Sequence, residues 1–215
     1  MNQNKLKLNL DVPQQRNMVL MSDKESEVKD DEPTLFKGEA IVFERWSNDL
    51  GGFKEIIHKG AWSAKTRFER AIATFNHKEE NLLGTYKSGT LRFDVQPESV
   101  HVEIDKANTE ISRSCSEWVK RGDIDGLSFM FFVEDSDLIY NSETELFEHH
   151  IYEFKEITDF SLVVRQSYNA TTVGLARGMD VNAFKELFKA KEEEKEANLK
   201  QANEDQALLD RILRK

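Results

Sequence analysis

The chain has 215 residues, of which 39% are apolar and 33% charged, and its formal net charge is −10. This length and apolar content suit one ordinary globular domain with tails and exclude wholesale disorder. The excess of acidic residues argues against a general nucleic-acid-binding protein, whose affinity comes from neutralising phosphates. The apolar stretch within residues 127–133 is much shorter than the ~20 residues needed to cross a bilayer, so we expect neither nucleic acid nor a membrane as a partner.

The cysteine content and the N-terminal composition bear on the compartment. Cys115 is the single cysteine, so no intramolecular disulfide and no cysteine-built zinc site can form. The first thirty residues are polar and lack the apolar segment of a secretory signal. We therefore expect the protein to act in the cytoplasm.

Composition divides the chain into three regions. Residues 1–33 are expected to form a disordered acidic arm, because residues 22–32 contain six acids and two lysines and are followed by Pro33. Residues 34–178 carry the strand and helix signals of a folded domain. Residues 179–215 are expected to form an amphipathic, highly charged helical tail.

Apolar residues alternate along short segments of the folded domain, as in half-buried strands. This pattern, together with runs of aromatic and β-branched residues, predicts strands over 39–45, 91–95, 100–104, 127–133, 151–157 and 160–164. The turn sequence Gln-Pro-Glu-Ser at 96–99 predicts that the second and third of these strands form an antiparallel hairpin.

Two predicted helices interrupt the strands. One covers 61–73, and the other covers 109–120, with Thr109 as its N-cap and Gly122 as its stop. Many short strands with two inserted helices predict an α+β, mainly β fold, either a β-barrel or a sandwich decorated by helices.

Ser128 is the candidate nucleophile. It lies in the apolar run 126–132, directly after the turn sequence Asp-Ile-Asp-Gly at 123–126. A strand entered from that turn would hold the hydroxyl in a fixed position, as nucleophilic catalysis requires. A serine whose hydrogen bonds are satisfied inside a buried strand fits the same residues, so the sequence leaves both interpretations open.

His77 is the candidate general base because it closes the strand-like run 72–76 and precedes a polar loop. The alternative is a solvated loop histidine. Asp159 is the candidate acid that would orient the imidazole, because Ile157 and Phe160 would partly bury it. Glu156 is the nearest substitute, and a turn aspartate between two strands is the structural alternative for Asp159.

Metal and nucleotide chemistry have little support in the sequence. His149 and His150 are adjacent in a strand-like segment, so their side chains would face opposite ways and could not share one ion. Neither common glycine-rich phosphate loop occurs. Cys115 lies on the apolar stripe of the predicted helix beside Trp118, where a core residue is expected. We expect no metal and no cofactor.

Several short motifs then follow one another in a recognisable order. They lie at 38–43, 53–57, 58–62, 76–77, 83–84, 88–91, 118–122, 124–126 and 127–129. In this order and spacing they resemble the prohead, or capsid-maturation, serine proteases of tailed phages of the Hong Kong 97 type. The resemblance spans about residues 36–175, roughly two thirds of the chain.

The resemblance implies a fold similar to herpesvirus assemblins, a β-barrel ringed by helices, with no cofactor. It implies Ser128 as nucleophile, His77 as general base and an acid after Ile157 as third member. The family usually has Glu followed by Val-Ser, whereas this chain has Asp159-Phe160-Ser161, and the family's later Pro-Ala is replaced by Gln-Ser at 166–167. Assemblin-like enzymes use a second histidine, which makes His101 a remote candidate. Arg165, which follows the last predicted strand, is the candidate donor to the oxyanion.

The implied substrates are scaffold-like segments of the major capsid protein and the protease's own ends, cut inside an assembling procapsid in the host cytoplasm. Residues 34–178 would be the protease domain. The helical tail could dock the enzyme into the shell, and a homodimer is possible. Two other functions fit the chain: a catalytically inactive assembly or scaffolding protein that keeps the fold, and an esterase that uses the same three residues.

Overall fold

The structure, a computed structural model, describes residues 5–7, 13–19 and 35–164, together with positions 185–186, 188–190, 193 and 200–201. The chain divides into two units, Met1–Met179 and Asp180–Lys215. In the described part of the first unit the elements are β1 (Lys5–Lys7), β2 (Gln14–Val19), β3 (Leu35–Val42), β4 (Phe53–Ile57), β5 (Ile72–Phe75), β6 (Lys78–Thr85), β7 (Leu91–Val95), β8 (Ser99–Asp105), α1 (Glu110–Arg121), β9 (Gly126–Asn141) and β10 (Leu146–Val163).

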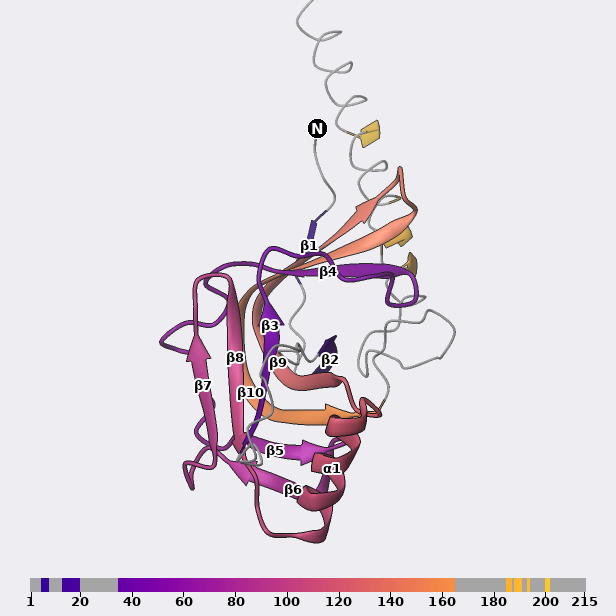
Figure 1. Cartoon of the computed structure of the whole chain (residues 1–215). Coiled ribbons are helices and arrows are strands. Elements are labelled where there is room, and N and C mark those ends of the chain that lie inside the picture. Colours follow the sequence, from indigo (N-terminus) through magenta and orange to yellow (C-terminus); the bar gives the residue numbers. More distant parts are fainter. Residues whose placement is uncertain are drawn as a thin grey trace, which may run out of the picture. The chain divides into compact units, whose positions relative to one another are not determined.

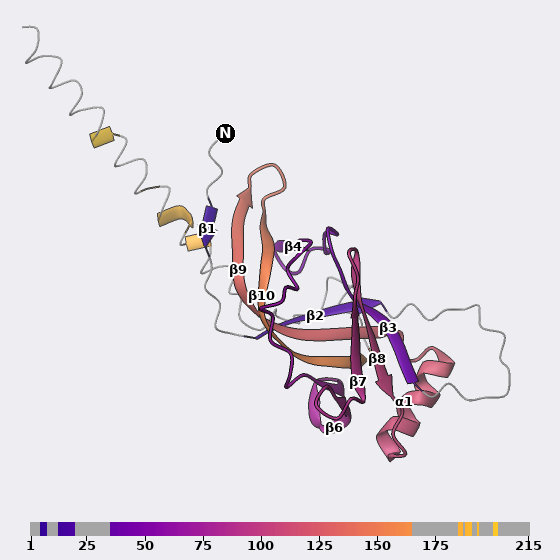
Figure 2. The ribbon, with the colours of Figure 1, turned by 90° about the vertical axis from the view of Figure 1, so that its left-hand side faces the viewer.

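A long hairpin, β9–β10, is the centre of the larger sheet (Figure 1). β1 and β2 pair with the outer edge of β9, and β4 and β5 pair in parallel with β10. β6 completes this seven-stranded sheet beside β5. The register of β9 and β10 shifts at several points between Ile151 and Asp159, and the two strands bend together (Figure 2). The hairpin therefore changes direction midway, so that one of its ends pairs with β4 and the other with β5.

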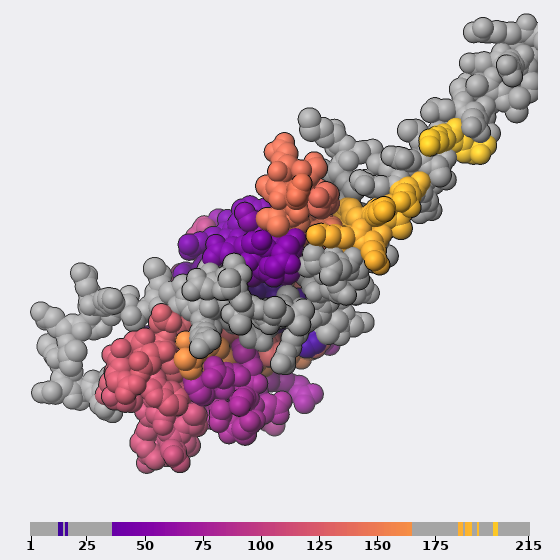
Figure 3. Space-filling model, turned by 90° about the vertical axis from the view of Figure 1, so that its right-hand side faces the viewer, coloured from indigo at the N-terminus to yellow at the C-terminus, as the bar shows by residue number. Residues whose placement is uncertain are grey.

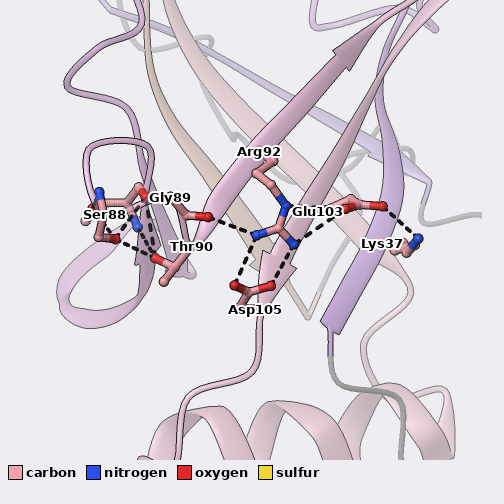
Figure 4. A network of polar contacts seen from close by, with 8 residues as sticks. Lys37, Ser88, Gly89, Thr90, Arg92, Glu103 and Asp105 are labelled. Atoms are coloured by element: carbon pink, nitrogen blue, oxygen red, sulfur yellow. Dashed lines mark hydrogen bonds and ion pairs between the residues drawn. The ribbon is translucent and has the colours of Figure 1, made fainter.

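The second sheet has three antiparallel strands in the order β3-β8-β7. An ion-pair network crosses it: the guanidinium of Arg92 lies 2.6 Å from Asp105 and 3.4 Å from Glu103, and Lys37 is 2.7 Å from Glu103 (Figure 4). These charges are exposed to solvent, which screens them, so each pair contributes little to stability. The network favours the strand register without being its main source of stability.

Phenylalanines from β9 and β10 form much of the core. The rings of Phe129, Phe131, Phe154 and Phe160 are almost completely buried and contact one another, with centroids 5.0 Å apart for Phe131 and Phe154. Burying one such side chain is worth about 1.5–3 kcal/mol. This packing fixes the two strands that carry most of the residues discussed below.

The helix α1 forms where local sequence signals predict it. The Thr109 hydroxyl accepts a hydrogen bond from the N–H of Ser112, and Gly122 ends the helix at φ 77°. Trp118 contacts Phe75 at the end of β5, with ring centroids 5.2 Å apart. Figures 1 and 3 show α1 lying beside the β5–β6 segment. The predicted helix, its caps and the β7–β8 hairpin are therefore confirmed.

Three predictions about the fold are wrong: the closed barrel, the ring of helices around it, and the helix over 61–73. The described part of the chain is mainly β, as predicted, but its two sheets form no closed barrel, and α1 is the one helix among the described residues of the first unit. The predicted helix over 61–73 is a series of turns followed by β5. Its backbone pairs with β10 instead, because the N–H groups of Phe154 and Ile157 donate to the carbonyls of Ala61 and Arg67, each at 2.8 Å.

Other strand and tail predictions differ in detail. The two strands predicted at 151–157 and 160–164 are one continuous strand, β10, so Asp159 is not a turn residue. The N-terminal arm, expected to be disordered, contains β1 and β2. In the second unit the described positions have helical backbone, and the rest of the predicted helical tail lies outside the described residues. No described helix is long and apolar enough to span a bilayer.

Candidate active site

A row of small hydroxyl residues crosses three neighbouring strands. Ser128 on β9 lies opposite Ser161 on β10, and Ser161 lies opposite Thr74 on β5. All three are fully buried. Asp159 precedes Ser161 by two residues, which places it on the same face of β10. The strand register thus brings hydroxyl groups and a carboxylate together on one face, and small side chains there leave room for a ring.

His77 follows β5 in the two-residue loop that joins it to β6. Both Asn76 and His77 have φ of 55°, a left-handed conformation that non-glycine residues rarely adopt and that type I′ hairpin turns require. The sheet holds this loop: the N–H of Asn76 donates to the carbonyl of Leu162, and the N–H of His77 donates to the Ser161 hydroxyl, each at 2.9 Å. The loop therefore stores backbone strain at a histidine, which is a common feature of functional sites.

The imidazole of His77 connects Ser128 to Asp159. Its Nε2 lies 2.6 Å from the Ser128 hydroxyl, and its Nδ1 lies 2.5 Å from Asp159 Oδ2. In the tautomer that this arrangement favours, Nδ1–H donates to the carboxylate and Nε2 accepts from the serine. A serine, an imidazole and a carboxylate in this order can generate a nucleophilic hydroxyl.

Thr74 and Ser161 support the carboxylate and the loop. The Thr74 hydroxyl lies 3.0 Å and 3.1 Å from the two oxygens of Asp159, and only 3.1 Å from the Ser161 hydroxyl. Ser161 donates to the carbonyl of Thr74 at 3.1 Å. A buried carboxylate needs such partners, because an ionised group without them is costly to bury.

The structure brings together three of the predicted residues and leaves the others elsewhere. Glu156 pairs with Arg67 at 2.8 Å. His101 lies on the other sheet, on β8, where it contacts Ser99 at 3.1 Å. Arg165, the suggested oxyanion donor, lies outside the described residues.

His149 and His150 face opposite sides of β10, as predicted. His149 Nδ1 lies 2.9 Å from Glu55, whereas the Nδ1 of His150 lies 3.0 Å from His58. Among the described residues, no group of three or more histidine, cysteine or acidic side chains could hold a metal ion. Cys115 is buried in the core, and its burial raises the pKa of the thiol to about 11.

Sequence reasoning missed Thr74 and Ser161. The signal for Ser161 was present, since a serine two residues after Asp159 on a strand shares its face. Thr74 could have been noted in the same way, as a polar residue within the apolar run that leads to His77. Neither residue type is unusual in a strand, so the pattern was not specific enough to select them.

Comparison with known proteins gives one family. No curated protein and no solved structure matches the chain. A family model described as caudovirus prohead serine protease matches residues 21–186, which is about three quarters of the sequence. Its span includes the whole His77, Ser128 and Asp159 cluster. The chain therefore belongs to the caudovirus prohead serine proteases, the serine peptidases of phage capsid maturation.

Proposed function

We propose that this protein is an endopeptidase in which Ser128 is the nucleophile, His77 the general base and Asp159 the orienting acid. The observation that supports this proposal is the continuous chain of contacts from the Ser128 hydroxyl through the His77 ring to Asp159, at 2.6 Å and 2.5 Å. Glu156 and His101 make their contacts with other residues, so Asp159 is the third member that we propose.

The reaction follows from this geometry. Ser128 attacks the carbonyl carbon of a peptide bond while His77 Nε2 takes its proton, and Asp159 stabilises the imidazolium through Nδ1. His77 then gives the proton to the leaving amine. In the second half of the reaction His77 takes a proton from water, which attacks the acyl carbon, and returns it to the Ser128 oxygen as the ester bond breaks and the carboxylic acid product leaves. Donors to the oxyanion are also needed, and loss of one such donor costs about 3 kcal/mol.

We further propose that the substrates are scaffold-like segments of the major capsid protein and the chain's own ends, cut inside the assembling procapsid in the host cytoplasm. Membership of the prohead protease family supports this choice of substrate. The rival function is an inactive assembly protein with the same fold. The fully hydrogen-bonded cluster favours the enzyme, because a scaffold has no use for a strained histidine loop that reaches a buried serine.

The test is co-expression of the chain with the capsid protein of the same phage, followed by intact-mass spectrometry of both proteins. We expect shortened capsid protein with the wild-type chain and full-length capsid protein with Ser128→Ala. Ser136→Ala is the matched control, since Ser136 is also buried on β9, and it should leave cleavage unchanged. If the capsid protein has the same mass with the wild-type chain as with Ser128→Ala, the protease is excluded. A wild-type chain that hydrolyses small esters but leaves the capsid protein intact would be an esterase.

A further inference from the structure

The strand β2 runs along the strand that carries the candidate nucleophile. β2 pairs antiparallel with residues 126–131 of β9 (Figure 2). In this register Asn17 lies opposite Ser128 and Arg16 lies opposite Phe129. Ser128 is 0% exposed in this arrangement. An edge strand beside a nucleophile is where an extended peptide can add to a sheet through main-chain hydrogen bonds. Here the chain's own residues 14–19 occupy that position.

Arg16 anchors β2 through a site built around Glu55. Its guanidinium donates from both Nε and Nη2 to the two oxygens of the Glu55 carboxylate, which is 3% exposed. Glu55 also contacts the fully buried His149, at 2.9 Å. The guanidinium carbon lies 5.9 Å from the ring centroid of Phe53 and 5.5 Å from that of Phe131. We call Phe53, Glu55, Phe131 and His149 the arginine site.

The chemistry of the arginine site selects a guanidinium. Two parallel N–H groups match a carboxylate, and the flat cation suits the aromatic rings, whereas a lysine ammonium offers no such fork. Burial alone would raise the pKa of Glu55, but the charge of Arg16 and the hydrogen bonds from His149 and Arg16 outweigh it and lower the pKa to about 2. Arg16 and His149 therefore hold Glu55 as a carboxylate, and displacement of β2 takes the guanidinium away from a buried acid.

We propose that the edge of β9, together with the arginine site, is the peptide-binding site of this protease. It takes an extended segment that carries an arginine, and residues 14–19 fill it as an internal peptide. The proposal rests on the proposed function, because it names the substrate class of the same catalytic site. A substrate segment gains access to Ser128 by replacing β2 and placing its own arginine against Glu55.

The first test measures binding to the full chain with Arg16→Ala and Ser128→Ala, so that no bond is cut. The probe is a fluorescent peptide with the sequence of residues 12–21, compared with versions that carry lysine or methionine in place of its arginine. We expect saturable binding of the arginine peptide, at least tenfold weaker binding of the lysine peptide, and weaker binding still of the methionine peptide. Equal binding of all three peptides, or no binding of any, would overturn the proposal.

A reversible lock provides the matched control. Gln15 and Met130 are directly opposite in the β2–β9 register, so Gln15→Cys with Met130→Cys, added to the same variant, can form a disulfide that holds β2 in place. The oxidised chain should not bind the arginine peptide, and the reduced chain should bind it. Binding that is the same in both forms contradicts a shared site. Arg92→Ala, which removes a partly exposed arginine of the other sheet, should leave peptide binding unchanged.

The second test uses the wild-type chain, so it does not depend on the stability of any variant. Hydrogen exchange of the segment 14–19 is measured with and without a saturating concentration of the arginine peptide. Displacement of β2 should speed exchange of that segment at least tenfold, and the methionine peptide should have no such effect. Unchanged exchange would refute the displacement. If the arginine peptide binds but the capsid protein is not cleaved, the peptide-binding site stands and the proposed protease function is wrong. If the capsid protein is cleaved but the three peptides bind equally, the protease function stands and the arginine site is wrong.

Discussion

The backbone N–H of His77 donates a hydrogen bond to the side chain of Ser161, across 2.9 Å. The two residues are far apart in sequence, and the bond ties the strained β5–β6 loop to the centre of the sheet. Ser161 uses its own hydrogen to bind the carbonyl of Thr74, so its lone pairs are free to accept from the loop. The position of the His77 ring therefore depends on a hydroxyl that does not touch the ring.

Ser161→Ala should weaken both stability and activity. The change leaves the partly buried N–H of His77 without its acceptor, which costs about 1 kcal/mol. We expect a lower urea midpoint and a kcat reduced by about tenfold or more, because each 1.4 kcal/mol of lost positioning corresponds to a factor of ten. Ser136→Ala, on the neighbouring strand, is the control and should not change kcat. Wild-type kinetics in Ser161→Ala would show that the loop holds its position alone.

Thr74→Val should lower kcat while preserving the fold. Valine keeps the shape of threonine but cannot donate to Asp159, and hydrogen bonds to charged groups are worth about 1.5–3 kcal/mol. Thr74→Ser keeps the hydroxyl and should retain most activity. The comparison of kcat and KM for the two variants tests whether the hydroxyl matters. A larger loss in Thr74→Ser than in Thr74→Val would instead point to packing of the threonine methyl group.

Asn76 should tolerate glycine but not alanine. Its φ of 55° costs alanine about 1 kcal/mol more than glycine, because the side chain crowds the backbone in the left-handed region. We expect Asn76→Ala to unfold at lower urea concentration than Asn76→Gly. A reversed order would mean that the loop changes conformation when Asn76 is replaced.

The stability of the chain should fall in acid because of Glu55. Its pKa is lowered from an ordinary 4.5 to about 2, so its contribution is fully present above pH 4.5 and is lost as the pH falls towards 2. Urea unfolding between pH 5 and pH 2.5 measures this slope. The paired variant Arg16→Met with Glu55→Gln, which removes both charges, should have a flatter profile. An equally steep profile would place the acid sensitivity elsewhere.

Cys115 should resist alkylation in the folded protein. Burial raises the pKa of its thiol to about 11, so little thiolate is present at neutral pH, and the side chain is inaccessible. Iodoacetamide at pH 8 should leave the native mass unchanged and add one label after unfolding in urea. Rapid labelling without denaturant would indicate that α1 opens readily.

The sequence predicts the elements that are determined by residues close to one another in the chain. Thr109 and Gly122 define α1 through contacts within one or two turns, and the turn at 96–99 defines the β7–β8 hairpin. The segment 61–73 was misassigned because its backbone groups bond to β10, a partner about ninety residues away that periodicity does not reveal. The closed barrel was wrong for a similar reason, since strand order is not encoded in alternation.

The candidate site was predicted in part. Ser128, His77 and Asp159 were selected from their places beside turns and strand ends and from the family resemblance, and the structure brings them into contact. The partnership of Arg16 and Glu55 could not be predicted, because a single arginine in a polar segment carries no sign of its distant partner. The contact depends on the register of β2 on β9, which brings Arg16 to Glu55.

The shared face of Ser128, Ser161 and Asp159 limits how this sequence can change in length. Adding or removing residues at the exposed tip of the β9–β10 hairpin, 142–145, leaves every pairing below it intact, so phage lineages are free to vary that tip. A single insertion beside Ser128 would turn its hydroxyl to the opposite surface of the sheet. Indels should therefore accumulate at the tip and be absent from the stretch that pairs 126–130 with 159–163.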